Sequence, residues 1–556
     1  MTQTIVIDGN SGTPVPVIDN DTDLVVGESG NLSTSDTAID ASGSATGRNF
    51  YINGTVFAND DYIFDFGAPG FSDGSSQLVV SGTGVMSGAE YGLLLDGGGI
   101  QIANSGTVEA RLTAVIVNGA DTQIVNSGLV TSSDGIGMTI AGANATIINH
   151  GTFSAGLRAI SGSGANLQLT NNGAIKSLAV EGITSGGANA TLTNHGTVFA
   201  KSSAVLSLGG DAIITNDGKL SSTAGAGILT KGDDATVSNS GTIGAKTLGI
   251  MLYGDDAIVT NDGLIRASAY GISVSADNAI VTNNKTIIAG GGVSIDGSNG
   301  VVTNDGTITG TVSSLATIDL GDAVKSGLHN SGLIAAKSIA VLGGSGTQSV
   351  FNSGTIKGSI DLGAGNDYFD GTGGKVAGMV SGGKGNDVYV ISNASTKLSE
   401  AKAGGTDLVK SSVSFTLGGN FENLTLNGKA NIKATGNDLA NQIHGNGGNN
   451  TIKGMAGNDM LWGHAGVDIL TGGGGADQFI FNTGDGKDTI TDFAATGTAH
   501  DKLDLSGTAS IRNYADLVKN HMTQTGGDVL IDALHGDSIL LKNVKLASLD
   551  ASDFLF

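Results

Sequence analysis

One motif recurs through much of this 556-residue chain: an aliphatic residue, then Asn two positions later, usually Gly two positions after that, and a further apolar residue. Successive Asn residues are 21 to 26 positions apart, and 248 residues over eleven intervals give about 22.5 per unit. A fixed period of this size is typical of a solenoid in which each repeat forms one coil. The anchoring residues are Asn104, Asn126, Asn149, Asn171, Asn194, Asn216, Asn239, Asn261, Asn283, Asn304, Asn330 and Asn352.

The alternation around each anchor predicts short β-strands. The residue two positions before the Asn is always Ile, Leu or Val, and residues two apart on a strand share a face, so the Asn points into the core as well. A buried amide needs partners, and a parallel β-helix supplies them if each Asn bonds the turn backbone and the Asn of neighbouring coils. An α-helix is rejected because Gly and β-branched residues are unfavourable in helix interiors and no 3.6-residue apolar period is present.

Tight corners between these strands are also visible in the sequence. Asp or Asn stands five residues before nine successive anchors, from Asp121 to Asn299, and Gly recurs two residues before that. We expect the Gly to mark a turn that needs positive φ. In four consecutive coils Asp residues would stack at matching corners, which suggests a secondary calcium stripe formed by Asp211, Asp233, Asp234, Asp255, Asp256 and Asp277.

The composition limits the kinds of binding partner that we expect for this chain. The formal net charge is -24, which disfavours nucleic acid and anionic membrane as partners and favours cations. No Cys is present, so disulfides and thiolate metal sites are excluded. No apolar run is long enough for a transmembrane helix, so membrane insertion is not expected.

A second period appears further along the chain. Glycines at 436, 445, 454, 463 and 472 are nine apart, and so are Asn441, Asn450, Asp459, Asp468 and Asp477. Large apolar residues keep the same interval from Ile443 to Phe479. Calcium is a hard cation that takes six to eight oxygen ligands, so glycine-loop carbonyls and carboxylates from stacked loops suit it.

These three registers resemble the RTX (repeats-in-toxin, haemolysin-type) nonapeptide Gly-Gly-x-Gly-x-Asp-x-U-x, in which U is a large apolar residue. The resemblance implies a parallel β-roll that binds several Ca²⁺ ions. Two loops make one turn, so Asp459 should stack on Asp477 and Asn450 on Asp468, and the neutral Asn residues predict weaker sites. The calcium-site residues expected are Asp367, Asp387, Asp459, Asp468, Asp477, Asp488, Asn450, Gly365, Gly385, Gly454, Gly457, Gly463, Gly466, Gly472 and Gly475.

The predicted fold is all-β: a parallel β-helix of about 22 residues per coil that continues into an RTX β-roll, closed by a small β-rich cap. The predicted segments are an N-terminal cap (1–23), the β-helix (24–361), a first RTX block (362–390), a spacer (391–435), the second RTX β-roll (436–480), and a C-terminal cap with a secretion signal (481–556).

The resemblance also implies an extracellular location at a Gram-negative surface. The ending Asp553-Phe-Leu-Phe556 is similar to the uncleaved signals of type I secreted proteins, and the start shows no cleavable signal peptide. Such a protein would use the type I secretion machinery and fold outside the cell on calcium binding.

Two functions remain open. The first is a structural or adhesive extracellular protein of surface-layer, matrix or adhesin type, which self-associates or binds cell-surface polysaccharide. The alternative is a β-helix uronan epimerase or lyase, which needs a carboxylate with a base on one sheet face. The residues Arg111, Arg158, Lys176, Lys201, Lys246 and Arg266 fall at several registers, so the sequence favours a non-enzymatic role without deciding the question. His-Glu-x-x-His is absent, which excludes a serralysin-type protease.

Overall fold

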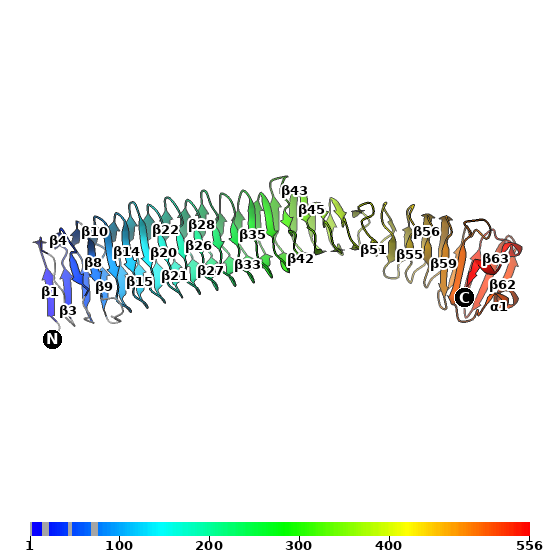
Figure 1. The fold of residues 1–556 in the computed structure, drawn as a ribbon, viewed down its shortest axis with the longest axis horizontal. Coiled ribbons are helices and arrows are strands. Elements are labelled where there is room, and N and C mark those ends of the chain that lie inside the picture. The colour runs from blue at the N-terminus through cyan, green and yellow to red at the C-terminus, as the bar shows by residue number, and fades with distance from the viewer. Residues whose placement is uncertain (1–2, 14–21, 43–46, 60, 68–75) are drawn as a thin grey trace. The chain divides into compact units, whose positions relative to one another are not determined.

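A computed structural model describes residues 3–13, 22–42, 47–59, 61–67 and 76–556 of the chain. Residues 1–2 and 14–21 of the predicted N-terminal cap lie outside this part. The chain divides into two compact units, residues 1–318 and 319–556, each built from stacked parallel strands (Figure 1). The predicted boundary at 361/362 falls inside the second unit, and the finer segment boundaries remain predictions.

A typical coil of the first unit contains three short strands. One coil comprises β15 (Gln123–Asn126), β16 (Leu129–Ser132) and β17 (Ile136–Ile140). The next comprises β18 (Thr146–Asn149), β19 (Thr152–Ala155) and β20 (Ile160–Gly162), and every strand pairs in parallel with its counterpart. The register places Ile124 beside Ile147 and Asn126 beside Asn149. Stacking already begins at β1 (Gln3–Ile7), which pairs with β3 (Thr22–Val26).

The inward Asn ladder is confirmed. In the first unit, each anchor from Asn104 to Asn283 donates its Nδ2 to the Oδ1 of the next anchor over 2.7 to 2.8 Å, and the anchors are 0 to 4% exposed. Most also donate to the carbonyl of the residue two positions later, as Asn194 does to Gly196. The ladder helps to fix the register, because a one-residue slip would turn the Asn and the aliphatic side chains out of the core and break the amide hydrogen bonds.

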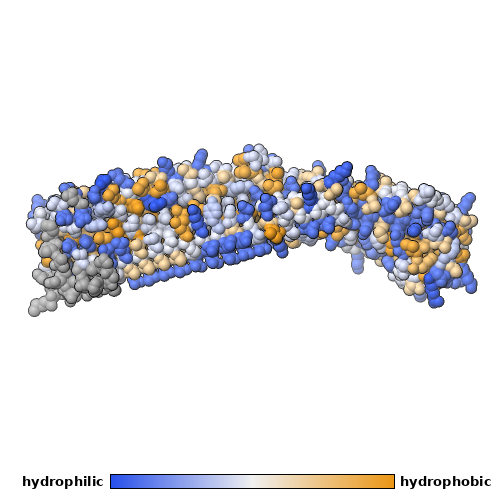
Figure 2. Space-filling model, in the orientation of Figure 1, coloured by the Kyte–Doolittle hydropathy of each residue, from blue (hydrophilic) through white to orange (hydrophobic). Residues whose placement is uncertain are grey.

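The corner prediction is wrong in one respect. The residues with positive φ are the Asp and Asn from Asp121 to Asn299, at +55° to +60°, and not the preceding Gly. A short polar side chain tolerates the left-handed region. The Gly is required for a different reason: a Cβ on Gly142, for example, would overlap the carbonyl of Gly119 in the coil before. The Asp and Asn corners are exposed, and Figure 2 shows a hydrophilic row along the edge where β21 (Gln168–Asn171) and β27 (Ile213–Asn216) lie.

In the second unit one parallel sheet runs through most of the segment, and its strands are β42 (Lys325–Asn330), β44 (Thr347–Asn352), β46 (Tyr368–Asp370), β49 (Val388–Ile391), β51 (Leu408–Ser411), β53 (Asn423–Leu426), β55 (Gln442–His444), β57 (Met460–Trp462), β59 (Gln478–Asn482), β61 (Lys502–Gly507) and β65 (Phe554–Leu555).

Facing it is an eight-stranded sheet of β52 (Phe415–Thr416), β54 (Lys433–Thr435), β56 (Thr451–Ala456), β58 (Ile469–Gly474), β60 (Lys487–Ile490), β64 (Asp537–Leu541), β63 (Asp528–Leu534) and β62 (Met522–Thr525). The last two strands pair antiparallel and end the parallel stacking. Ile443, Leu461 and Phe479 from one sheet and Ile452 and Leu470 from the other are fully buried, as the nine-residue apolar register predicts.

In the part of the chain that the structure describes, helix is confined to a few turns near the C-terminal end, so the all-β prediction is confirmed. These turns are α1 (Tyr514–Asp516), the π-helix η1 (Leu517–His521) and the 3₁₀ turns η2 (Leu546–Ser548) and η3 (Ala551–Asp553). Among the described residues, no helix is both long and apolar enough to cross a membrane.

Candidate metal centre

The nonapeptide loops connect the two sheets of the second unit. Residues 454–459 and 472–477 lead into β57 and β59, while residues 463–468 lead from β57 into β58 on the opposite edge. Each loop ends in an Asp that directly precedes a strand. Because strands eighteen residues apart are paired, the Asp residues at each edge form a row.

Glycine is needed at two loop positions for different reasons. Gly457, Gly466 and Gly475 have φ of +108°, +153° and +140°, a region that L side chains rarely adopt. At the first position, a Cβ on Gly454 or Gly472 would overlap Oδ2 of the Asp five residues later. The loop therefore closes over the carboxylate, and glycine leaves room for its second oxygen.

Along each row the carboxylates are joined to backbone donors of the preceding coil. On one edge the N–H of Asn441 donates to Oδ1 of Asp459 (2.7 Å), that of Asp459 to Asp477 (2.9 Å), and that of Asp477 to Asp501 (3.0 Å). On the other edge the N–H of Asn450 donates to Asp468 (2.6 Å), and that of Asp468 to Asp488 (2.8 Å). The stacking of Asp459 on Asp477 and of Asn450 on Asp468 is therefore as predicted.

The second oxygen of these carboxylates has no partner. Within the described chain, Oδ2 is buried without a hydrogen bond in Asp367, Asp387, Asp407, Asp459, Asp468, Asp477 and Asp488, and these residues are 0 to 2% exposed. Burial without a counter-charge disfavours the ionised form. It raises the pKa of Asp459 to about 7 and the pKa of Asp488 to about 8, although the backbone N–H groups act in the opposite direction.

A row of buried carboxylates with free oxygens fits a divalent cation that takes oxygen ligands. When bound, calcium supplies the positive charge that such a row lacks. The residues that would hold it are Asp459, Asp468, Asp477 and Asp488, with the glycine loops around them. Two neighbouring positions differ. The amide of Asn441 donates to the backbone carbonyls of Phe421 and Glu422, and the amide of Asn450 donates to the backbone carbonyl of Ile432 and to Oδ1 of Asn446.

The side chain of Asn450 is thus satisfied by the protein alone, and the weaker calcium site at that end remains a prediction. Asp501, the last carboxylate of the other row, is also satisfied by the protein, because its Oδ2 accepts the N–H of Ala494. Metal binding by each individual residue remains a prediction.

The first block places Asp367 and Asp387 in a row of the same kind. The N–H of Asp367 donates to Oδ1 of Asp387 (2.7 Å), and the N–H of Asp387 donates to Asp407 (2.9 Å). Gly365 and Gly385 have φ of +116° and +122°, as the loop position requires. Sequence reasoning missed Asp407 and Asp501, although both carry the signal of an Asp two residues before a buried apolar residue, here Val409 and Leu503.

The acidic stripe proposed from the corner residues differs from these rows. All six side chains are exposed. Oδ1 of Asp233 accepts the N–H of Asp255 (3.1 Å), and Oδ1 of Asp255 accepts that of Asp277 (2.9 Å). Asp233, Asp255 and Asp277 thus stack on successive coils, linked by hydrogen bonds from a backbone N–H to the carboxylate of the coil before. Calcium binding by the stripe remains a prediction.

Two of the six basic residues considered above lie together. Lys246 and Arg266 line a shallow groove of about 590 Å³ with Ser222, Ser268 and Thr311. The groove lining contains no Asp or Glu. In contrast, Arg111 pairs with Glu90 (2.7 Å) and Arg158 with Glu181 (2.8 Å).

Comparisons with known proteins agree with the repeat geometry. A family model of the RTX calcium-binding nonapeptide repeat matches four copies over residues 435–479. The chain is 39% and 37% identical over 173 residues to two endo-1,3-1,4-β-glycanases of Rhizobium meliloti, ExsH and EglC, a match that covers 31% of this chain. The chain thus spans about a third (34%) of the length of these relatives.

Among solved structures, the chain is similar to the AlgE6R3 subunit from the Azotobacter vinelandii mannuronan C5-epimerase. The identity is 25%, the match covers 26% of this chain and 83% of that one, and the TM-score is 0.19.

Proposed function

From the RTX calcium-binding nonapeptide repeats that this chain carries at residues 435–479, we propose that the protein is a secreted structural or adhesive component that folds when it meets calcium outside the cell. The observation that carries the proposal is the buried, unpartnered Oδ2 of Asp459, Asp468, Asp477 and Asp488. In low calcium these carboxylates oppose folding, and in millimolar calcium a bound ion reverses that effect. The type I machinery would export the unfolded chain.

The remaining part of the chain suits a rigid spacer. The first unit holds its coils together by the Asn ladder and an aliphatic core. It therefore does not need the ion to fold. A spacer of this kind places its ends far apart and can associate with copies of itself, as expected of a surface-layer, matrix or adhesin protein.

The test is to follow folding with and without calcium. We expect chelation to unfold the second unit and leave the first folded, which would appear as two thermal transitions in circular dichroism, of which only one shifts with calcium. Electron microscopy of the calcium-loaded protein should then show ordered sheets or filaments. A single transition that calcium does not move would contradict the proposal.

A second candidate, action on or binding to polysaccharide, has two supports. The relatives that share 173 residues are named as glycanases. In addition, the groove with Lys246 and Arg266 presents positive charge and hydroxyl groups along several coils of an otherwise acidic protein, which suits an acidic polysaccharide. The shared segment is too short a part of either relative to bring the activity with it.

This candidate is tested with alginate and pectin as probes, by following uronate unsaturation in absorbance and binding in co-sedimentation. The variant Lys246→Ala with Arg266→Ala should lose binding, while Lys231→Ala, an exposed lysine outside the groove, should retain it. Formation of unsaturated product would favour a lyase, and binding without product would favour an adhesive role. Absence of both binding and product would exclude these polysaccharides as the partner.

A further inference from the structure

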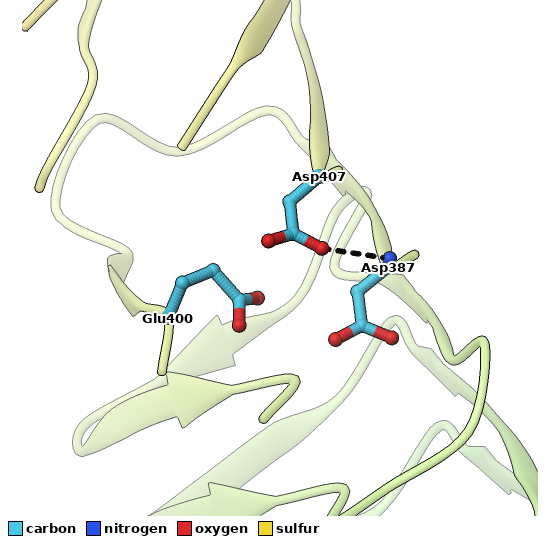
Figure 3. Close-up of side chains that lie close together, drawn as sticks. All are labelled: Asp387, Glu400 and Asp407. Carbon is cyan, nitrogen blue, oxygen red and sulfur yellow. Dashed lines mark hydrogen bonds between the residues drawn. The ribbon is translucent and has the colours of Figure 1, made fainter. Parts of the chain in front are cut away.

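Three carboxylates, one from the predicted first block and two from the predicted spacer after it, meet at one point. Asp387 directly precedes β49, Asp407 directly precedes β51, and Glu400 directly follows β50 (Lys397–Ser399). Because β49 and β51 pair in parallel, with Val388 beside Leu408, the two Asp residues are stacked on neighbouring coils. The three side chains are directed toward one another (Figure 3), and each offers an oxygen within 4.8 Å of the other two.

All three are at least nine-tenths buried. Asp407 is 0%, Asp387 1% and Glu400 9% exposed. Oδ1 of Asp407 accepts the N–H of Asp387 (2.9 Å), while Oδ2 of Asp387 and Oδ2 of Asp407 have no partner within the described residues. Two independent atoms of the cluster are therefore buried without a hydrogen bond.

Both oxygens of Glu400 accept hydrogen bonds from the protein, which hold the side chain in place. Its Oε1 accepts the hydroxyl of Tyr389, and its Oε2 accepts the N–H of Gly383 (3.1 Å). The ion pairs found in the described part of the chain leave all three carboxylates without Lys, Arg or His. Burial raises the pKa of Glu400 to about 7 and the pKa of Asp407 to about 6, so the protein alone does not compensate their charge.

We propose that Asp387, Glu400 and Asp407 bind one calcium ion, at a site separate from the RTX block of residues 435–479. The set departs from the nonapeptide pattern, since Glu400 comes from a strand end rather than from a glycine loop. Asp387 belongs to the predicted first block, whereas Glu400 and Asp407 lie outside both predicted blocks. The proposal does not depend on the function proposed above, because no residue of the segment 435–479 contributes to the site.

The spacing of the oxygens is compatible with calcium. Calcium–oxygen distances are about 2.3–2.6 Å, so ligands on opposite sides of one ion are about 5 Å apart, and the oxygens of the cluster lie within 4.8 Å of one another. Magnesium retains several waters, for which a site this deeply buried leaves little room. The ion would join β49, β50 and β51 and thereby fix the loop between Asp387 and Asp407.

The test counts bound calcium in the full chain, by equilibrium dialysis with atomic emission at a fixed free calcium concentration. Glu400→Gln and Asp407→Asn should each lose one ion relative to the parent, and the double variant should lose only one, because the residues share a site. The control Asp370→Asn changes a partly exposed carboxylate of the same unit and should keep the parental number.

Terbium luminescence provides a second readout that removes no ligand. Tyr389 donates to Glu400, so it should sensitise terbium bound at this site, and Tyr389→Phe should lose that part of the emission while retaining the fold by circular dichroism. An unchanged ion count in Glu400→Gln would overturn the proposal. If that variant does not fold, unchanged terbium emission in Tyr389→Phe would overturn it. Neither result bears on calcium binding by the RTX block of residues 435–479. The variants Asp459→Asn and Asp477→Asn test the ions of that block separately.

Discussion

Replacing Asp459 by Asn should change the stability of the second unit in opposite directions with and without calcium. In calcium-free buffer at pH 8 the parental carboxylate is ionised and buried with an unpartnered Oδ2. Its pKa is raised from 3.8 to about 7. At about 1.36 kcal/mol per pH unit, ionisation at pH 8 lowers the free energy of unfolding by up to about 4 kcal/mol. The Asn variant removes this cost, so it should be more stable than the parent.

With calcium the sign reverses. The ion then pairs with the carboxylate, and removing one partner of a buried charge pair costs roughly 3–5 kcal/mol. The chain already contains Asn at the equivalent loop position 441, with its amide satisfied, which indicates that Asn itself fits the loop.

The assay is urea unfolding at pH 8 with millimolar calcium or with chelator. Trp462, the only tryptophan of the chain, lies on β57 just after Asp459 and reports the roll by fluorescence. The exposed Asp438 of a neighbouring loop supplies the control, and Asp438→Asn should have little effect in either buffer. If Asp459→Asn lowers stability by the same amount in both buffers, the unpartnered carboxylate is not the group that makes the roll depend on calcium.

Three other perturbations follow from the same structure. In calcium-free buffer the free energy of unfolding of the second unit should fall as pH rises from about 4 to 8. The folded-state pKa values of Asp468, Asp459 and Asp488 are about 6, 7 and 8, above the ordinary 3.8, so the folded state binds more protons than the unfolded state in this pH range. Melting curves at several pH values measure the effect, and a rise in stability with pH would refute the reasoning. Gly475→Ala should destabilise the calcium-loaded roll by about 1–3 kcal/mol, since φ is +140° and the Cβ would overlap Gly457, whereas Gly474→Ala enters open space and should be nearly neutral in the same urea titration. Asn216→Ala should cost about 2–4 kcal/mol in the first unit, independently of calcium, because Asn194 and Asn239 each lose a buried hydrogen bond; circular dichroism at both calcium levels measures it.

The sequence was sufficient to predict the features that repeat. A 22-residue period with an inward Asn predicts a parallel β-helix with an amide ladder, and three coincident nine-residue registers predict the roll and its core. Both follow because the strand period of two and the coil period are local rules that each unit obeys independently.

Features that depend on contacts between coils were harder to predict. The positive φ belongs to residues such as Asp121 rather than to Gly119, because the Gly is required by a close approach that only the stacked structure reveals. Likewise, Glu400 joins Asp387 and Asp407 across a segment in which the nine-residue period is lost, so no spacing rule connects them. The Asp-x-apolar pattern at Asp407 was present in the sequence, but without the register it did not distinguish a buried carboxylate from a turn residue.

The hydrogen bonds along the carboxylate rows have a direction. Every N–H described in these rows donates to a side chain that lies later in the chain, from Asn441 to Asp459, Asp477 and Asp501. A roll cut after Asp477 would leave that donor unsatisfied at its open end. Both oxygens of Asp501 accept N–H groups, so Asp501 ends this series of hydrogen bonds. The residues after the last repeat therefore terminate the row of stacked carboxylates as well as the parallel sheet, which ends at β65.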